Sequence, residues 1–393
     1  MKYVLYGVET NNKGAELMLY AILQEIERRD PRAKVYLPLQ AVKQGLEYLQ
    51  TNVELHYWPY EYFIKKYHLN GIMRRLHLPP LVDAKALKAD YFIDASGFRF
   101  SDQCNLWGTT PGWWQKLLSA QHRNGAKIVF LPQAFGPLEE PDTRQTVSIL
   151  NSFASVLMPR DQVSETYLRN SGIVDMNKVK LFPDFTSLVE GSVPGKYEHL
   201  KGGICIIPNQ KMILKGNISL DGYIELIGHI IKEASQTNRP VYLLNHEGPD
   251  DEALAYECQK AIDGGVEVVT GLDALQVKGL ISTAYLVVTS RFHGLVSALN
   301  SCVPSLATSW SHKYAELYRD YGLENYVLPL ADVTESVAQV RALLNEDENR
   351  KIRERLQPQV AQVKAKSSEM WNFVWSDEIQ PLKTTSSRKI RSL

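Results

Sequence analysis

The residues best suited to chemistry follow an apolar run late in the chain. The run Leu286–Ser290 ends in two hydroxyl residues, and Arg291, Phe292, His293 and Gly294 follow directly. A helix opening at this glycine would present backbone N–H groups and the positive end of its dipole to an anion. Arginine can bind a phosphate or carboxylate through two parallel hydrogen bonds, and histidine, with an ordinary pKa of about 6.5, suits proton transfer near neutrality. The segment predicts an anion site with an acid–base group. The alternative is that His293 caps the helix or is hydrogen-bonded in the core.

Further polar residues follow other short apolar runs. Arg160 and Asp161 come directly after Val156–Pro159, and Asp184 follows Pro183. Open α/β sheets bind ligands at the carboxyl ends of their strands, so Arg160 and Asp161 are candidates for ligand binding. The carboxylates of Asp161 and Asp184 could take part in proton transfer. The alternative for Asp161 is a helix N-cap, and the alternative for Asp184 is a turn residue.

A polar loop after the first apolar run contains Asn12, Gly14 and Glu16. Glycine permits close approach of the backbone to a ligand, and a carboxylate can deprotonate a hydroxyl. A plain tight turn is the alternative interpretation. Ser96-Gly97 and Gln133 also stand at the ends of apolar runs.

These candidates lie at the ends of predicted strands in two alternating sets of strands and helices. Predicted strands of the first set lie at 3–6, 34–37, 91–94, 127–131 and 156–159, and those of the second at 203–208, 240–245, 267–270, 286–290 and 305–308. Helical patterns lie between them, for example at 15–28, 220–236, 252–262 and 294–300. This alternation predicts an α/β fold of two doubly wound, Rossmann-like domains that face a cleft.

A glycine-rich polar stretch at 190–203 is typical of a domain boundary. We therefore predict an N-terminal Rossmann-like domain at residues 1–195 and a C-terminal one at 196–332. Residues 333–375 are helical in pattern, and residues 376–393 form a polar, basic tail that we expect to be flexible.

Composition narrows the function classes. The 393 residues include 44 Lys plus Arg and 44 Asp plus Glu, so a global attraction to nucleic acid is not indicated. The four cysteines are widely spaced and form no C-x-x-C pair, which disfavours a zinc ribbon or a disulfide framework. No stretch approaches about 18 consecutive apolar residues. We predict a cytoplasmic protein whose contact with the inner membrane face is at most peripheral.

Taken in order, these segments resemble the motifs of the polysaccharide pyruvyl transferase family. The resemblance runs from about Lys2 to Gly322, and six motifs occur in the expected order. They are Asn12 with Gly14, Ser96-Gly97, Leu131-Pro-Gln-Ala-Phe-Gly-Pro137, Arg160-Asp161 with Ser164, Pro183-Asp184, and Ser290-Arg-Phe-His-Gly294 with Lys313.

The resemblance implies a fold similar to that of GT-B glycosyltransferases and a specific reaction. Family members transfer the pyruvyl group of phosphoenolpyruvate onto two hydroxyls of a sugar, forming a cyclic ketal and releasing phosphate, without a dissociable cofactor or a metal. The acceptor is expected to be a surface polysaccharide or its free or lipid-linked precursor. The resemblance also leads us to expect that the helical segment 333–375 crosses back to the N-terminal domain.

Roles follow for individual residues. We assign catalysis to His293 as the general acid, with Asp161, Asp184 and Glu16 as alternative bases. The residues assigned to phosphoenolpyruvate are Arg160, Arg291, Phe292, Ser290 and Lys313. Those assigned to the acceptor, on the N-terminal domain, are Asn12, Gly14, Glu16, Ser96, Gly97 and Gln133. We further predict that Arg160 and Arg291 face the same space.

Two departures from the family pattern concern the acceptor side. An acidic residue often follows the first-loop glycine, where this chain has Ala15, and the segment Phe98–Gln103 is less glycine-rich than expected. Two other functions stay open. One is a GT-B sugar-nucleotide glycosyltransferase, although no carboxylate within Arg291–Pro304 could hold a ribose. The other is a non-catalytic carbohydrate- or anion-binding protein.

Overall fold

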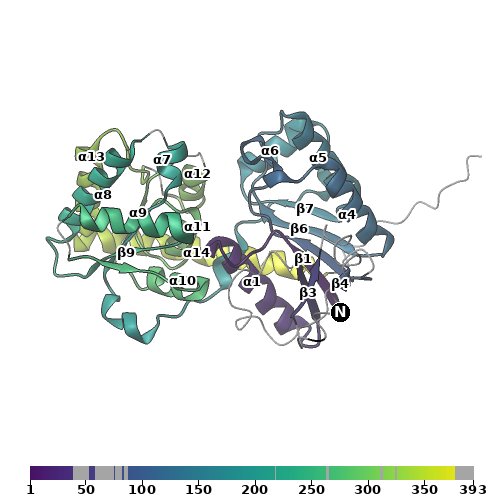
Figure 1. The fold of residues 1–393 in the computed structure, drawn as a ribbon, viewed down its shortest axis with the longest axis horizontal. Helices are drawn as coiled ribbons and strands as arrows, with labels where there is room; N and C mark the ends of the chain where they lie inside the picture. The colour runs from purple at the N-terminus through teal and green to yellow at the C-terminus, as the bar shows by residue number, and fades with distance from the viewer. Residues whose placement is uncertain are drawn as a thin grey trace, which may run out of the picture. The chain divides into compact units, whose positions relative to one another are not determined.

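The computed structural model describes residues 1–38, 53–57, 75, 82–83, 87–216, 218–262, 265–309, 313–323 and 325–376. It divides into two compact units (Figure 1). Unit 1 comprises Met1–Glu9, Ile22–Pro183 and the residues from Glu369 onward, and unit 2 comprises Thr10–Ala21 and Asp184–Ser368. The predicted boundary at residue 195 lies inside unit 2. Of the predicted basic tail only Ser376 is described, and the rest lies outside the described residues.

Unit 1 is built on a parallel sheet with the strand order β4-β3-β2-β1-β5-β6-β7. The order reverses between β1 and β5, and such switch points are where doubly wound sheets bind ligands. Its strands are β1 (Lys2–Tyr6), β2 (Lys34–Pro38), β3 (Val53–Tyr57), β4 (Val82–Asp83), β5 (Tyr91–Asp94), β6 (Lys127–Gln133) and β7 (Val156–Pro159).

Helices pack against this sheet because each has one apolar face. In α4 the buried residues include Trp114, Leu117 and Leu118, and they join Phe92 and Phe130 of the strands in one core. Among the described residues before Asp184, the helices of this unit are the C-terminal part of α1 (Lys13–Arg29), α4 (Pro111–Arg123), α5 (Pro141–Phe153) and α6 (Gln162–Ser171), with 3₁₀ turns at Asp102–Gly108 and Met176–Lys178.

Unit 2 holds a second parallel sheet, ordered β10-β9-β8-β11-β12. Side chains of β8 alternate between its faces: Ile204 and Ile206 enter one core, whereas Cys205 and Ile207 enter the other. The order reverses between β8 and β11. The strands are β8 (Ile204–Ile207), β9 (Val241–Leu244), β10 (Glu267–Val269), β11 (Leu286–Thr289) and β12 (Ser305–Ala307).

The helices of unit 2 cover both faces of this sheet. Asp273 and Gln276 form a capping box that fixes the start of α10. The helices are α7 (Lys211–Lys215), α8 (Leu220–Ala234), α9 (Gly248–Lys260), α10 (Ala274–Ser282), α11 (Phe292–Asn300), α12 (Lys313–Asp320), α13 (Val333–Leu344) and α14 (Glu346–Val374), with 3₁₀ turns at Phe185–Leu188 (η5) and Gly195–Leu200.

The predicted helical segment 333–375 is two helices, because Asn345 leaves the helical conformation between α13 and α14. Leu356 and Val360 of α14 pack in the core of unit 2. The last residues of the helix belong to unit 1, where Trp371 contacts Trp375 and the Trp375 indole N–H donates a hydrogen bond of 3.2 Å to the Tyr3 hydroxyl.

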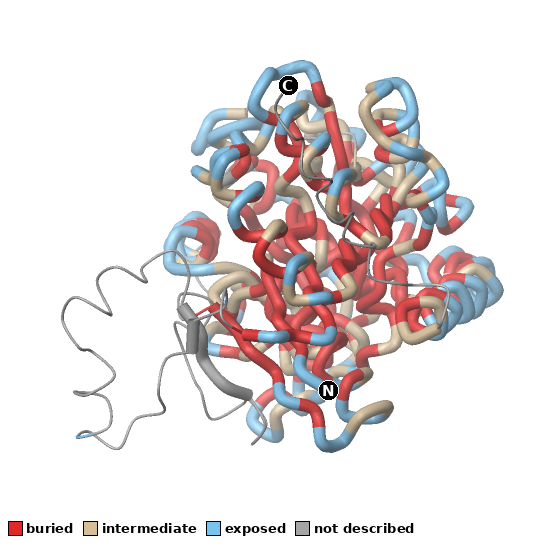
Figure 2. Tube along the Cα trace, turned by 90° about the vertical axis from the view of Figure 1, so that its right-hand side faces the viewer, coloured by how far each residue is buried: buried red, intermediate tan, exposed pale blue. Residues whose placement is uncertain are grey.

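Burial follows this layered plan. Where the structure describes burial, the strand residues are almost entirely buried, and the helices turn exposed residues outward (Figure 2). Across the residues that the structure describes, no helix combines the length and the apolar composition that crossing a membrane requires.

Candidate active site

His293 lies in the first turn of α11, directly beyond the carboxyl end of β11. Arg291 is extended (φ −108°, ψ 128°) and is the N-cap, so the helix begins at Phe292, two residues before the predicted start. The His293 side chain is 17% exposed, and its Nε2 lies 3.8 Å from Oδ2 of Asp184. The imidazole therefore stands at the switch point of the second sheet with a carboxylate beside it.

The first loop of the chain packs against the other side of this imidazole. The Asn12 side-chain oxygen accepts hydrogen bonds from the N–H groups of Gly14 (2.9 Å) and Ala15 (3.2 Å), which fixes the start of α1. A Cβ atom at Gly14 would overlap the ring of His293 at Nδ1. Glycine is thus required here because the backbone touches the histidine. Both Asn12 and Gly14 lie in unit 2 with His293, although we had placed them on the N-terminal domain.

Glu16 is a buried carboxylate one turn further along α1. Its Oε2 lies 2.7 Å from Nζ of Lys13. Burial raises the pKa of Glu16, while the ion pair with Lys13 and a hydrogen bond from the backbone of Ala274 oppose the rise. A carboxylate with a raised pKa accepts a proton more readily, which suits a general base.

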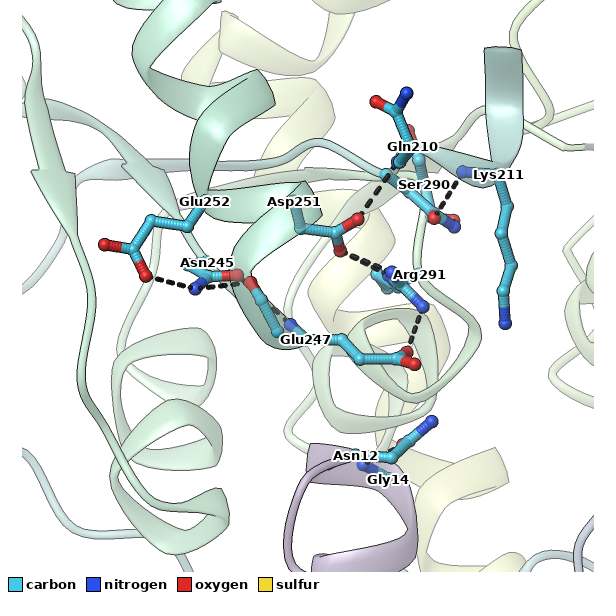
Figure 3. A network of polar contacts seen from close by, with 12 residues as sticks. Asn12, Gly14, Gln210, Lys211, Asn245, Glu247, Asp251, Glu252, Ser290 and Arg291 are labelled. Carbon is cyan, nitrogen blue, oxygen red and sulfur yellow. Dashed lines mark hydrogen bonds and ion pairs between the residues drawn. The ribbon is translucent and has the colours of Figure 1, made fainter. Parts of the chain in front are cut away.

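Arg291 is held between two acidic side chains of the β9–α9 region (Figure 3). Its Nε donates to Oδ2 of Asp251 at 2.7 Å, and its Nη1 is paired with Glu247. Asp251 is 1% exposed, and its other oxygen accepts a hydrogen bond of 3.0 Å from the Gln210 N–H. Burial raises the pKa of Asp251, although Arg291 opposes the shift.

This network changes the interpretation of Arg291. We predicted that it grips the phosphate or carboxylate of the donor. In the structure two carboxylates already engage its guanidinium, so a donor anion would have to displace Glu247, the more exposed of the two. The arrangement is better suited to fixing the turn before His293. Donor binding by Arg291 stays a prediction.

His246 is a second histidine of the site. It follows β9 and is 4% exposed. Burial, together with the positive charges of Arg291, His293 and Lys13, lowers the pKa of His246 well below its ordinary value. Its environment therefore disfavours the charged form of His246.

Ser290, Phe292 and Lys313 were also assigned to the donor. The Ser290 hydroxyl is 2.6 Å from the Tyr223 hydroxyl and is also bonded to Thr308, so it is occupied within the core. The Phe292 ring is buried and contacts the His293 ring edge-on at 5.5 Å. Nζ of Lys313 lies 5.2 Å from the centre of the Phe292 ring, which brings this lysine to the start of α11.

Asp184 is both a turn residue and a neighbour of His293. Its Oδ1 caps the short turn η5, accepting hydrogen bonds from the Thr186 N–H (2.9 Å) and hydroxyl (2.5 Å). Its Oδ2 is the atom that faces His293. The two interpretations of Asp184 from the sequence are therefore compatible.

Three predicted acceptor residues meet at the switch point of unit 1 around Asp94, which the sequence analysis did not single out. Oδ1 of Asp94 accepts hydrogen bonds from the Ser96 N–H (3.1 Å) and from Gln133 Nε2 (3.2 Å). Gly97 follows with a φ of 72°, a conformation that favours glycine. Burial raises the pKa of Asp94, opposed chiefly by the charge of Arg99. This guanidinium lies 5.2 Å from the centre of the Tyr6 ring.

Arg160 and Asp161 follow β7 in the same unit. Asp161 is the N-cap of α6, with its Oδ1 accepting a hydrogen bond of 2.7 Å from the Ser164 N–H. Arg160 is buried, and its Nε lies 3.8 Å from Oδ2 of Asp161. Asp161 therefore takes the cap role that the sequence offered as its alternative, and the choice of base among Asp161, Asp184 and Glu16 stays a prediction. That Arg160 faces the same space as Arg291 stays a prediction.

Three of the residues that sequence reasoning missed, Asp94, His246 and Glu247, share one signal. Asp94 ends β5, and His246 and Glu247 follow β9. The rule that selected Arg160 and His293, a polar residue at the carboxyl end of a parallel strand, applies to them too. Asp251 carried no such signal, because it lies inside a helix.

Comparison with solved structures supports the same architecture. The chain is similar to a candidate UDP-N-acetylglucosamine 2-epimerase of Listeria monocytogenes, with a TM-score of 0.60, 14% identity and coverage of 98% of this chain and 99% of that one. It is also similar to Anabaena HepE in complex with UDP and glucose (TM-score 0.56, 11% identity, 95% and 98%). A third is WaaG, a glycosyltransferase of lipopolysaccharide biosynthesis (0.54, 11%, 95% and 99%). The predicted fold is confirmed: two Rossmann-like domains of the GT-B type.

Sequence comparison addresses the family. No curated protein sequence matches the chain. The family model of polysaccharide pyruvyl transferases matches residues 12–312, which span both the first loop and the His293 helix. These two segments meet at the imidazole in the structure. With a match over most of its length, the chain belongs to the polysaccharide pyruvyl transferase family.

Proposed function

We propose that this protein transfers the pyruvyl group of phosphoenolpyruvate to two hydroxyls of a sugar, forming a cyclic ketal and releasing phosphate. The observation that carries the proposal is the position of His293 at a helix start, between the Gly14 backbone and the Asp184 carboxylate. The family match supports a pyruvyl transferase.

The chemistry requires an acid beside the donor. Protonation of the methylene carbon by the His293 imidazolium turns C2 into an electrophile, and the first sugar hydroxyl adds there. The second hydroxyl then replaces phosphate at C2. One hydroxyl proton ends in the new methyl group, by way of the histidine, and the other leaves with phosphate. The nearby Asp184 carboxylate favours the charged imidazolium that the first step consumes.

Phosphoenolpyruvate carries a phosphate and a carboxylate, and its binding site must offer hydrogen-bond donors or cations to both. The start of α11 at Phe292 presents the positive end of the helix dipole beside His293. Lys313, beside Phe292, adds a cation at that end. We assign these groups to the phosphate or carboxylate of phosphoenolpyruvate.

A base must take the proton of the sugar hydroxyl. Glu16 is buried, and burial raises its pKa, so it is suited to accept this proton. Asp184 is the alternative, because one of its oxygens is directed at the reaction centre. We place the acceptor in surface polysaccharide synthesis, as a free or lipid-linked precursor on the cytoplasmic side, with Ser96, Gly97 and Gln133 among its contacts.

A sugar-nucleotide glycosyltransferase is the second candidate. The structure brings two carboxylates, Glu247 and Asp251, beside Arg291, whereas the sequence around Arg291 offered none. A ribose hydroxyl could bind a carboxylate there. Both carboxylates are bonded to the guanidinium, however, and this favours the pyruvyl transferase.

Incubation with phosphoenolpyruvate and a panel of free and lipid-linked oligosaccharides tests the proposal. We expect phosphate release that depends on the acceptor, together with a product heavier than the acceptor by one pyruvyl ketal in mass spectrometry. The same panel with UDP-sugars is the matched arm. UDP release without consumption of phosphoenolpyruvate would reject the proposal in favour of glycosyl transfer. Binding without turnover in either arm would favour the non-catalytic function.

A further inference from the structure

A buried lysine lies behind the Asp184–His293 pair. Lys278 of α10 is 3% exposed, and its Nζ donates a hydrogen bond of 2.8 Å to the carbonyl oxygen of Thr186. A charge this deeply buried is costly unless it is compensated. Burial lowers the pKa of Lys278 to about 8, and Asp184 is the leading group that opposes the shift. Asp184 therefore supplies the main counter-charge for the buried ammonium group of Lys278.

Thr186 connects this lysine to Asp184. Its carbonyl accepts from Lys278, while its N–H and hydroxyl donate to Oδ1 of Asp184 at 2.9 and 2.5 Å. The other oxygen of Asp184 faces His293 Nε2 at 3.8 Å. One carboxylate oxygen is thus fixed by the turn, and the second is directed at the imidazole.

Backbone contacts fix how closely α10 approaches this turn. A Cβ atom at Gly279 would overlap the backbone of Ser192, and one at Gly191 would overlap the backbone of Lys278 and Gly279. The Ser192 N–H also donates a hydrogen bond of 3.0 Å to the Leu275 carbonyl. These backbone contacts therefore fix the position of Lys278 relative to the chain segment that follows the turn.

Hydrogen bonds to helix α14 also hold this turn in place. The Ser367 hydroxyl donates to the Asp184 carbonyl oxygen at 3.3 Å, and it accepts a hydrogen bond of 2.7 Å from the Ser187 hydroxyl. Both serines are buried. The serines hold the backbone of the turn, whereas Lys278 combines a hydrogen bond to the turn with a positive charge.

We propose that Lys278 is a positioning residue of the His293 site, which holds Asp184 in place against the imidazole through Thr186. Lys278 touches neither the donor nor the acceptor in this account. The expected effect of Lys278 on reaction rate rests on the proposed function. The expected effect of Lys278 on the His293 titration does not rest on it, because that effect exists without substrate.

The test is an NMR titration of the His293 imidazole in the whole protein, assigned by the His293→Asn variant. Asp184→Asn sets the reference: without the neighbouring anion, His293 should titrate at lower pH. Lys278→Met should shift the titration in the same direction, because Asp184 is no longer held in place. If Lys278 acted only as a nearby cation, its removal would shift the titration to higher pH. A shift to higher pH, or no shift, overturns the proposal.

Two further variants serve as controls for the His293 titration in Lys278→Met. Lys364 also acts electrostatically on Lys278 but is exposed on α14, so Lys364→Met should leave the His293 titration unchanged. Thr186→Val removes the hydroxyl that holds Asp184 and keeps the lysine, and it should lower the titration pH as Lys278→Met does. If Lys278→Met fails to fold, as judged by circular dichroism, the test depends on Thr186→Val alone. An unchanged His293 titration in Thr186→Val would then reject the connection from Lys278 through Thr186 to Asp184.

Kinetics give the second readout. Misplacement of a reacting group by about 1 Å can cost about a hundredfold in rate. We expect Lys278→Met to lower kcat by about tenfold to a hundredfold with little change in KM for phosphoenolpyruvate, since the donor contacts are retained. An unchanged kcat would contradict the positioning role. If the wild-type protein does not consume phosphoenolpyruvate at all, the proposed function fails, and the NMR titration still decides on Lys278.

Discussion

His293 is enclosed by groups that come from three distant parts of the sequence. Gly14 contacts its ring from the first loop, Asp184 faces its Nε2, and Arg291 caps the helix that carries it. Asn12, Gly14, Asp184 and His293 could be selected from sequence because each belongs to a recognisable motif. The engagement of Arg291 by Glu247 and Asp251 could not, since these residues lie about 40 positions away and carry no common motif.

At the residue scale, the contact between Gly14 and the imidazole makes a clear prediction. A methyl group at this position would overlap the ring, so Gly14→Ala should displace His293 and lower kcat by about a hundredfold. It should also lower the melting temperature, even though alanine favours a helix by about 1 kcal/mol over glycine.

Gly228 in α8 is the matched control. A methyl group there would meet only Ile262, at 3.4 Å, an ordinary contact. Gly228→Ala should therefore leave kcat unchanged and raise the melting temperature slightly. If Gly14→Ala behaved like this control in turnover and thermal melting, the close approach of the first loop to His293 would be wrong.

At the element scale, the ends of parallel strands collect the functional groups. The strands beside both switch points were predicted because their apolar runs are nearly continuous, as buried parallel strands require. The runs at β3 and β4 were not predicted, and neither were the short helices α7 and α12. Val53–Tyr57 alternates apolar and polar residues, and Val82–Asp83 is too short for a periodic pattern.

The pair of Asp251 in α9 and Arg291 before α11 should stabilise unit 2. Removing one partner of a buried ion pair costs about 3–5 kcal/mol, because the other charge is left uncompensated. Glu247 still pairs with Arg291, so we expect Asp251→Asn to lower the free energy of unfolding by about 3 kcal/mol, the lower end of that range. Urea unfolding followed by circular dichroism measures it.

The exposed pair of His199 and Glu267 serves for comparison. Both side chains are about half exposed, and exposed ion pairs contribute little to stability. Glu267→Gln should leave the unfolding midpoint where it is. Equal midpoints for Asp251→Asn and Glu267→Gln would show that the buried network does not hold the two elements together.

At the scale of the whole molecule, the sequence predicted two Rossmann-like domains but not which residues each unit takes. The order of motifs along the chain suggested that the first loop serves the N-terminal domain. Thr10–Ala21 instead belongs to unit 2. The last residues of α14 belong to unit 1, the domain toward which the resemblance leads us to expect this segment to cross. Such exchanges depend on long-range packing, as in the hydrogen bond between Trp375 and Tyr3, which no local pattern encodes.

The central claim is that His293 delivers the proton that activates phosphoenolpyruvate, and a paired measurement on His293→Asn tests it most directly. Asparagine keeps some hydrogen bonding but cannot titrate. General acid–base groups contribute about 10²–10⁴-fold to rate, so the single-turnover rate should fall by that factor while calorimetry shows phosphoenolpyruvate bound with nearly wild-type affinity. A single-turnover rate near that of the wild type would contradict the account, because another group or a water molecule would then be the acid and His293 would serve only the start of its helix.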